Sequence, residues 1–494
     1  MAKANAKSKK GSPVGLVSTL KTYDAISFDL VQNAKGEEHY KDDFISIDID
    51  NFEEESKTGF YSGVSISIYD ATSFEDLDAL LKDKSSWEFE LPIVKVHLQG
   101  LRFSQFQKFM EIIGAEIIEL SVILEVDDFN SENLYEACPK LERFEIETWS
   151  EFKIELKDLE KIKLKYFRIN APAISDKSLD LSQSTIAEIN WSAKFARLDL
   201  PIGIQKLEMG SCESKAKINW SDLKGLESLI FSVDEESKDD LVFFKDLLSL
   251  KDLELNIVGY PVKGKNKIEM PSNLQSLKLH TSSQDSITID LGFVETCQDL
   301  RHLEVSSNVR NGGKGFANYE SLKCLTKLET LEIGEDGLGM EGYKSKFTPS
   351  CLNALSGLKK LTLKGMGNVS DMSGFGSLEN LDYLKLYESR ISSLKGIAPL
   401  KKLKELELSD CHEIADFMEL GSIHLNKFVF VIGGYWGTEV KFKKEGILAF
   451  KDIEISEINF DIDGWKFAKK DFKDLTKKYE METDGPTLSL ELKK

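Results

Sequence analysis

A six-residue pattern, L-x-x-L-x-L, recurs along most of this chain and constrains its fold more than any other feature. In LKELEL, from Leu403, the first two leucines are three residues apart and the last two are two residues apart. A step of three is typical of a helical turn, and a step of two is typical of a strand with one buried face. Each copy therefore predicts a turn or helical segment that runs directly into a short strand.

The copies of the pattern return at a nearly constant spacing. About sixteen can be counted, mostly 22 to 26 residues apart, with longer gaps after those at Leu300, Leu328 and Leu425. Such a period predicts a solenoid, because one coil cannot bury its own apolar residues and depends on its neighbours. The copies begin at Leu91, Ile117, Leu141, Leu164, Ile186, Ile204, Leu226, Leu250, Leu274, Leu300, Leu328, Leu358, Leu381, Leu403, Leu425 and Ile455.

With this motif and period, the chain resembles the leucine-rich repeat family over roughly residues 90–463. The resemblance implies an α/β solenoid, a leucine-rich repeat horseshoe with a parallel β-sheet on its concave face. The family pattern continues as L-x-x-L-x-L-x-x-N/C, and its last residue caps the turn by hydrogen bonding to backbone between coils. Cys212, Asn308 and Cys411 occupy that position here.

The repeats are of more than one class. GNVSDMSGFGSLENL, from Gly367, and SRISSLKGIAPLKKL, from Ser389, resemble the short internalin-like repeats of the family. FKDLLSL, before Leu250, is instead a candidate for a fuller helix. We therefore expect a solenoid of mixed class, in which several coils also lack the capping Asn or Cys.

The repeat divides the chain into four predicted parts. Residues 1–18 are expected to be a flexible basic tail, and residues 19–86 a β-rich N-terminal domain or cap. The evidence for strands there is the alternation in AISFDLV, FISIDID and GVSISIYD. Residues 87–463 form the predicted solenoid of about 16 repeats, and residues 464–494 a C-terminal cap.

The C-terminal cap is predicted to be helical. GWKFAKKDFKDLTKKYE places Trp465, Phe472, Leu475 and Tyr479 at helical spacing, with lysines on the other face. The exposed end of a solenoid needs cover, and an amphipathic helix would supply it.

The composition is that of an acidic globular protein. The net charge of -20 repels the phosphate backbone, so we expect no nucleic acid as partner and favour a basic protein; solubility alone is the alternative reading.

The sequence has no apolar run of about 18 residues, so no membrane segment is expected. The six cysteines form no CxxC pair, and the first residues contain no apolar stretch of a signal peptide. We therefore expect a cytoplasmic location.

Motifs that imitate chemical sites are incomplete. GLGMEG, from Gly337, matches G-x-G-x-x-G but does not open a helix, and NFDIDGWKFAKK, from Asn459, has Lys470 where a calcium loop needs Glu. His280 and His302 lie on neighbouring coils and could share a metal, although a chance meeting on a sheet is the commoner reading. We expect no catalytic residue, no cofactor and no metal site, and we do not expect an enzyme.

Two groups of outward residues are candidates for partner binding. The first is Tyr383, Lys385 and Tyr387, which lie beside Glu405 and Glu407 of the next coil. Tyrosine suits an interface because it buries a large area and keeps a polar handle. The alternative is an ordinary solvated strand face.

The second group is in FVFVIGGYWGTEVKF, from Phe428. Val429 and Val431 replace the usual polar outward residues, and Tyr435 and Trp436 lie among glycines. An exposed aromatic tip would be a docking site, whereas a turn folded over the solenoid end would be part of the cap.

These features favour a non-enzymatic protein–protein interaction protein. It would act as an adaptor, an inhibitor or a structural subunit of an assembly, and bind a protein through the concave face or the C-terminal edge. The alternative is a bacterial effector or virulence protein that uses the repeats to recognise its target. The oligomeric state is open.

Overall fold

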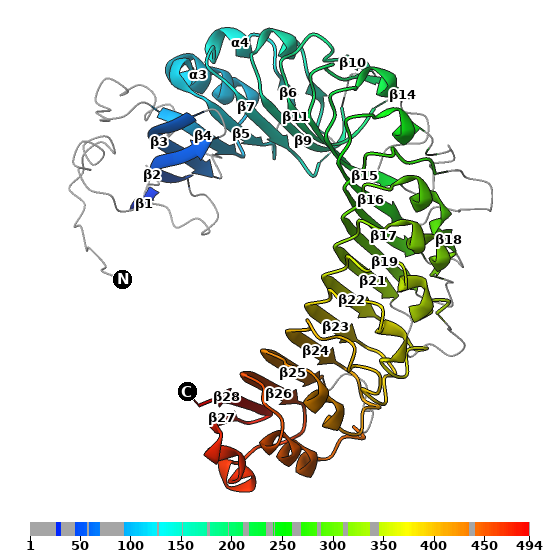
Figure 1. Ribbon diagram of the computed structural model, residues 1–494. Coiled ribbons are helices and arrows are strands. Elements are labelled where there is room, and N and C mark those ends of the chain that lie inside the picture. Colours follow the sequence, from blue (N-terminus) through cyan, green and yellow to red (C-terminus); the bar gives the residue numbers. More distant parts are fainter. Residues whose placement is uncertain are drawn as a thin grey trace, which may run out of the picture. The chain divides into compact units, whose positions relative to one another are not determined.

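The computed structural model describes the chain in segments. These are residues 26–30, 45–56, 59–69, 93–125, 128–150, 152–174, 178–195, 197–210, 217–233, 241, 243–258, 268–283, 288–309, 315–335, 345–433 and 440–493. The chain divides into two compact units, Met1–Leu226 and Glu227–Lys494. In each unit, the strands of successive coils lie side by side and the connecting segments lie behind them (Figure 1).

The first unit contains an antiparallel segment that leads into a parallel ladder. Strands β1, β2 and β3 pair antiparallel, β3 pairs parallel with β4, and the ladder continues through β5, β7, β9, β11 and β13. The three stretches expected to be strands in residues 19–86 therefore form strands. The bounds are β1 Ile26–Leu30, β2 Ile45–Ser56, β3 Gly59–Tyr69, β4 Ile93–Gln99, β5 Glu119–Ile123, β7 Arg143–Glu147, β9 Tyr166–Ala173, β11 Glu188–Lys194 and β13 Lys206–Met209.

The second unit is a longer parallel ladder. Each strand from β15 to β26 on this face pairs in parallel with the strand of the next coil. The bounds are β15 Ser228–Val233, β16 Asp252–Val258, β17 Ser276–Ser283, β19 His302–Val309, β21 Thr330–Glu335, β22 Lys360–Lys364, β23 Tyr383–Tyr387, β24 Glu405–Ser409, β25 Lys427–Ile432 and β26 Glu457–Ile462.

The change of period inside each repeat follows from a tight turn before each strand. The amide of Leu403 donates to the carbonyl of Leu400 at 3.1 Å, which is an i to i+3 bond, and β24 begins two residues later. Leu406 and Leu408 are then spaced by two because alternate strand residues face the core, where they are 1% and 0% exposed. The leucines three apart therefore mark a 3₁₀-type turn, and those two apart mark the strand.

The segments behind the ladder are mostly 3₁₀ turns. The fuller helix expected in FKDLLSL is wrong: Phe243–Asp246 is a 3₁₀ segment. The α-helices described are α3 Phe103–Ile113 and α4 Leu134–Ala137, both in the first unit. The 3₁₀ segments are Gly114–Glu116, Leu159–Lys161, Trp220–Asp222, Phe243–Asp246, Leu291–Thr296, Tyr319–Cys324, Pro349–Leu352, Ser373–Phe375, Met418–Ser422, Lys444–Lys451, Lys469–Phe472 and Leu475–Lys477.

Short strands also pair between coils away from the main ladder. They form three small parallel sheets. Their strands are β6 Phe129–Asn130, β8 Ile154–Glu155, β10 Ser178–Asp180, β12 Arg197–Asp199, β14 Lys217–Ile218, β18 Ile289–Asp290 and β20 Phe316–Ala317.

The capping position of the repeat is occupied as the motif implies at Cys411. Its thiol is fully buried and donates to the carbonyl of Leu386 in the preceding coil at 3.5 Å. Burial raises the pKa of this thiol to about 12, so it stays protonated and able to donate. Cys212 and the side chain of Asn308 lie outside the described residues.

The prediction of a helical C-terminal cap is wrong. Residues 464–493 make two short 3₁₀ turns and then an antiparallel hairpin, β27 Tyr479–Asp484 and β28 Thr487–Leu492. Strand β28 pairs antiparallel with β26, so the hairpin extends the ladder (Figure 1). Three of the four apolar residues expected on the inner face, Phe472, Leu475 and Tyr479, are at most 1% exposed, whereas Trp465 is only half-buried. Their spacing was misread because turns, like a helix, return every three or four residues to one side.

Phenylalanines fill the core under the last coils of the second unit. The ring of Phe417 lies 4.5 to 6.1 Å, between centroids, from five other rings. Those rings are Phe428, Phe430, Phe442, Phe450 and Phe460. One side chain therefore joins several consecutive coils.

We predict that Phe417→Ala lowers the free energy of unfolding by about 3–5 kcal/mol, the usual cost of removing a buried ring. Amide hydrogen exchange should show the loss of protection concentrated in the last coils. The neighbouring Met418 is 60% exposed, and Met418→Ala should change stability by no more than about 0.5 kcal/mol. Equal effects of the two substitutions would contradict the assignment of Phe417 to the core.

We also predict that Gly365→Ala is more destabilising than Gly464→Ala. Both residues have positive φ, +75° and +76°, so both substitutions carry a backbone cost of about 1–2 kcal/mol. A Cβ at Gly365 would lie 1.8 Å from the carbonyl oxygen of Glu335, whereas one at Gly464 meets nothing within 4 Å. Urea unfolding should therefore separate the two variants by at least about 1 kcal/mol; no difference would contradict this close approach.

Candidate functional site

The outward residues of the second unit form continuous rows because the strands stay in register. The central row runs from β15 to β26 as Ile230, Glu254, Lys278, Glu304, Glu332, Thr362, Lys385, Glu407, Val429 and Asn459. We call this surface, with the rows on either side of it, the strand face. Its rows mix charged, polar and apolar side chains.

The structure brings the first predicted group together on the strand face. Tyr383 pairs with Glu405, and Lys385 with Glu407, across β23 and β24. The ammonium of Lys385 lies 2.7 Å from a carboxylate oxygen of Glu407, and the hydroxyl of Tyr383 donates to the other at 3.2 Å. The side chains of Lys385 and Glu407 are about a third and a quarter exposed. The group is therefore a connected polar cluster rather than a set of independent surface residues.

The pKa values of Tyr383 and Glu407 are shifted in opposite directions. Burial, followed by the charge and hydrogen bond of Glu407, raises the pKa of Tyr383 to about 12. Burial also acts to raise the pKa of Glu407, but the hydrogen bonds from Lys385, Ser409 and Tyr383 outweigh it and lower the pKa. Both shifts keep Tyr383 neutral and Glu407 ionised near neutral pH, which is the arrangement that a cationic ligand group would meet.

Tyr387 lies at the edge of this cluster. Its ring faces the ammonium of Lys364 on the preceding coil, 5.1 Å from the centroid. Across the strands it is opposite Ser409, whose hydroxyl donates to Glu407 at 3.1 Å. The two tyrosines therefore flank the ion pair of Lys385 and Glu407 on the same face.

The second predicted group is placed in part. Val429 and Val431 face outward from β25 and are half-buried. Val429 lies between Glu407 and Asn459 of the neighbouring strands. Tyr435 and Trp436 lie outside the described residues, so the docking tip expected there stays a prediction.

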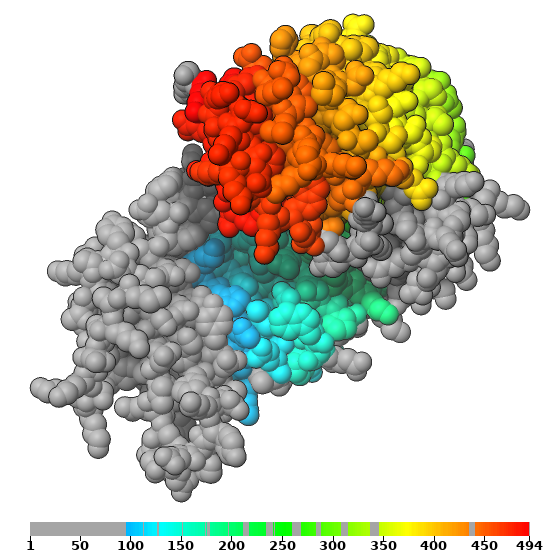
Figure 2. Space-filling model, turned by 90° about the horizontal axis from the view of Figure 1, so that it is seen from below, coloured from blue at the N-terminus to red at the C-terminus, as the bar shows by residue number. Residues whose placement is uncertain are grey.

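The C-terminal hairpin adds acidic residues that the sequence reading missed. Glu491 pairs with Glu457 of β26, and Glu480 pairs with Glu491, so all three share the strand face. Glu482 lies in the next row, opposite Ser489. The alternation of apolar and polar residues in YEMETD and TLSLEL was a signal for two strands. These residues were instead assigned from the sequence to a capping helix and the segment after it. Figure 2 shows the last coils and the hairpin as one continuous packed surface, orange to red.

In the first unit, the register corrects the alignment of the first repeat. Val96 pairs with Leu120, so the first motif is IVKVHL from Ile93 rather than LPIVKV from Leu91. The central outward residue is therefore His97 and not Lys95. A shift by two residues leaves the alternation of apolar and polar residues unchanged, so the sequence pattern alone could not reveal the misalignment.

His97 lies in a shallow hollow of about 330 Å³ on the outward face of strands β4, β5 and β7, beside Ser121, Arg143 and Glu145. Its Nδ1 is 3.1 Å from the hydroxyl of Ser121, and burial lowers its pKa although Glu145 and Glu147 act to raise it. The guanidinium of Arg143 binds Glu145 at 2.7 Å, so the charges around the hollow largely cancel. Ser121 lies between His97 and Glu145 in the row, so the imidazole does not bridge a serine and a carboxylate as in a nucleophile triad.

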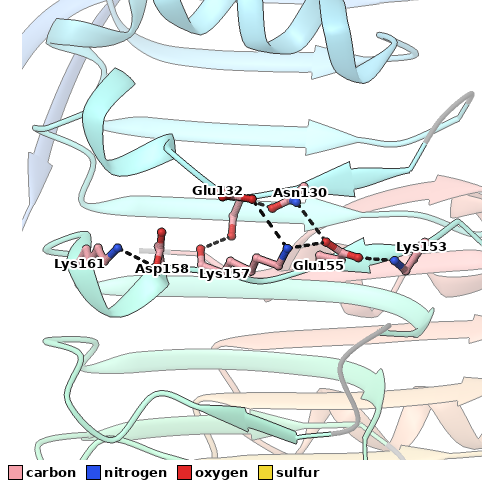
Figure 3. A network of polar contacts seen from close by, with 8 residues as sticks. Asn130, Glu132, Lys153, Glu155, Lys157, Asp158 and Lys161 are labelled. Carbon is pink, nitrogen blue, oxygen red and sulfur yellow. Dashed lines mark hydrogen bonds and ion pairs between the residues drawn. The ribbon is translucent and has the colours of Figure 1, made fainter.

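A second polar network lies behind the first unit, on the coils of β6 and β8 (Figure 3). Lys157 binds Glu155 at 3.1 Å and Glu132 of the preceding coil at 3.7 Å, and the amide of Asn130 donates to Glu155 at 3.1 Å. Hydrogen bonds from Lys153 and Lys157 lower the pKa of Glu155. With the pair of Lys161 and Asp158, three lysines balance three carboxylates, so the network links coils weakly and carries no net charge for a ligand.

The two histidines considered for a metal are not partners in the ladder. His280 is opposite Ser306, and His302 is opposite Ser276. The Nδ1 of His280 is 2.7 Å from the hydroxyl of Ser306. Across the described residues, no three His, Cys, Asp or Glu side chains gather closely enough to hold a metal ion.

No helix in the described part of the chain is both long and apolar enough to cross a bilayer.

Solved structures similar to this chain are leucine-rich repeat proteins. One is a leucine-rich repeat protein of Leptospira interrogans, with 14% identity, a TM-score of 0.36 and coverage of 74% of this chain and 89% of that one. The functional domain of InlJ from Listeria monocytogenes has 12% identity, a TM-score of 0.34 and coverage of 86% and 83%. Toll of Drosophila, in complex with Spatzle, has 11% identity and a TM-score of 0.45, and the match covers 93% of this chain and 62% of that one.

No family model and no curated protein matches the chain. The fold is therefore defined by this chain's own repeat: inward leucines, a 3₁₀-type turn before each strand and a parallel ladder of coils. These are the features of a leucine-rich repeat solenoid.

We predict that Glu407→Gln lowers the pKa of Tyr383, because it removes the carboxylate charge beside the phenol. An unfolded tyrosine titrates near pH 10. With a pKa of about 12 in the folded chain, Tyr383 favours folding below pH 10, and this contribution is lost as the pH rises to about 12. Ultraviolet difference titration against Tyr383→Phe, with and without Glu407→Gln, measures the shift. An unchanged Tyr383 titration in Glu407→Gln would contradict the contact.

Proposed function

We propose that this protein is a non-enzymatic interaction protein that binds a protein partner through the strand face of its second unit. The observation that carries the proposal is the group of half-buried side chains on three adjacent strands. Tyr383 and Tyr387 on β23, and Val429 and Val431 on β25, lie on either side of β24, the strand of Glu405 and Glu407. Aromatic and apolar side chains surrounded by polar groups are the usual anchors of protein interfaces.

The charges on the same face favour a basic partner. Glu405 and Glu407 lie beside the tyrosines, and Glu480, Glu482 and Glu491 follow on the hairpin. The chain as a whole has a net charge of -20, so its long-range field acts in the same direction. A lysine- or arginine-rich surface would be steered to this face and would replace solvent around these carboxylates.

The role as adaptor, inhibitor or structural subunit depends on the partner. All three require a preformed surface, and a parallel ladder whose registers hold over ten coils supplies one without a folding step on binding. We place the protein in the cytoplasm, supported by buried free thiols such as Cys138, Cys297, Cys351 and Cys411, which suit a reducing compartment.

The test begins with affinity capture of the tagged full chain from its native cell lysate at low and high salt. The captured partner is then purified and its binding to variants is measured by calorimetry and stopped flow. Tyr383→Ala should weaken binding at least tenfold, mainly through faster dissociation, since hot-spot residues contribute about 2 kcal/mol or more.

The charge reversal Glu480→Lys with Glu482→Lys should instead slow association about tenfold at low salt and little at high salt. Glu419→Lys with Glu445→Lys is the matched control, because both residues are exposed on 3₁₀ segments behind the ladder and the change in net charge is the same. If this control slows association equally, the effect is one of net charge. If Tyr383→Ala and the hairpin variant both bind normally, the strand face is not the interface.

A further inference from the structure

A basic hollow lies at the edge of the second unit, where the chain enters strands β22, β23 and β24. Its volume is about 660 Å³. Four of its lining side chains are lysines and one is a carboxylate, in a chain whose net charge is -20. The lining residues are Gly357, Lys359, Asn380, Asp382, Lys401, Lys402, Leu403, Lys404 and His424.

The backbone under the hollow is held by hydrogen bonds between coils. The carbonyl of Lys359 accepts the amides of Asp382 and Tyr383 at 2.8 and 3.1 Å. The carbonyl of Asp382 accepts those of Lys404 and Glu405 at the same two distances. Successive coils are therefore held at strand spacing, about 4.8 Å, and the lysines they carry project from a rigid edge.

Two lysines are held by neutral oxygens. The ammonium of Lys402 donates to the side-chain carbonyl of Asn380 at 2.6 Å, and that of Lys401 donates to the backbone carbonyl of Ser422 at 2.9 Å. Lys404 pairs with no carboxylate of the described residues. These contacts orient the side chains of Lys401 and Lys402, and they involve oxygens that carry no charge.

The fourth lysine already has an ion-pair partner. The ammonium of Lys359 lies 2.6 Å from Glu329, a carboxylate that also binds Arg301 at 3.1 Å. With Lys359 set aside because of that ion pair, the lining contains three lysines and the one carboxylate of Asp382, an excess of two positive charges.

We propose that this hollow binds a phosphate-bearing anion. A phosphate monoester carries a charge of about -1.5 to -2 at pH 7, which matches the excess, and lysine ammonium groups are common phosphate partners. The volume lies within the range of small-ligand sites, about 300–1,000 Å³. The phosphate comes either from a free polyphosphate or from a phosphorylated protein segment. This site does not depend on the strand face, because the two surfaces use different side chains.

Calorimetry of the full chain at low salt tests the proposal with inorganic tripolyphosphate and with a phosphoserine peptide of otherwise neutral residues. Lys402→Gln with Lys404→Gln should weaken binding of whichever probe binds the parent chain by at least about tenfold, because the change removes two of the three positive charges that face the anion. Both side chains are exposed, so folding should be unaffected. Lys469→Gln with Lys473→Gln is the matched control, because these lysines are also exposed and lie in turns near the C-terminus.

The two probes distinguish the two sources of phosphate. Binding of tripolyphosphate alone supports a free phosphate as the ligand. Binding of the phosphoserine peptide, with none by its unphosphorylated form, supports a phosphorylated protein segment. The proposal is overturned if neither probe binds, if the Lys402 and Lys404 variant binds as tightly as the parent, or if the control pair weakens binding equally.

Discussion

The hydrogen-bond ladder between successive coils is the constraint on which the rest of this structure depends. A single carbonyl in front of most strands, such as that of Asp382, accepts two amides from the next coil. The strands therefore stay in register from one coil to the next, and each coil buries its leucines against its neighbours. A coil alone offers too little core to fold, so stability, register and the identity of the outward face are consequences of the same contacts.

Register also decides which distant residues become neighbours on the surface. Lys385, Glu407 and Val429 are 22 residues apart in sequence and adjacent on the strand face. The same rule sets adjacent residues of one coil on different surfaces: Lys404 lines the basic hollow, and Glu405 faces outward beside Tyr383. An acidic solenoid can in this way present an anion site and a cation-attracting face on the same few coils without bringing the opposite charges into contact.

The last segment of the second unit and the first repeat of the first unit show where sequence reading succeeds and fails. The apolar positions of the last segment were expected correctly, as Phe472 and Leu475 show, but not its hairpin. Two 3₁₀ turns followed by a strand place residues inward at intervals close to those of a helix, so the pattern could not separate the two. The pairing of β28 with β26 favours the hairpin over a helix, because it completes the backbone hydrogen bonds of the last parallel strand. In the first unit, a two-residue shift hid His97, since strand alternation is unchanged by a shift of two.

What the sequence determined by itself is the repeat. Its period, its inward leucines and its division into turn and strand follow from local spacing, because 3₁₀ turns and strands each have a fixed geometry that one coil already expresses. The outward positions of Tyr383, Lys385, Glu405 and Glu407 follow from the same spacing. Only the tertiary structure decided how these side chains pair, that the C-terminal hairpin adds carboxylates to their face, and that residues of the two preceding coils meet the lysines of residues 401–404 around one hollow. Those features depend on contacts between residues more than twenty positions apart, which local periodicity does not encode.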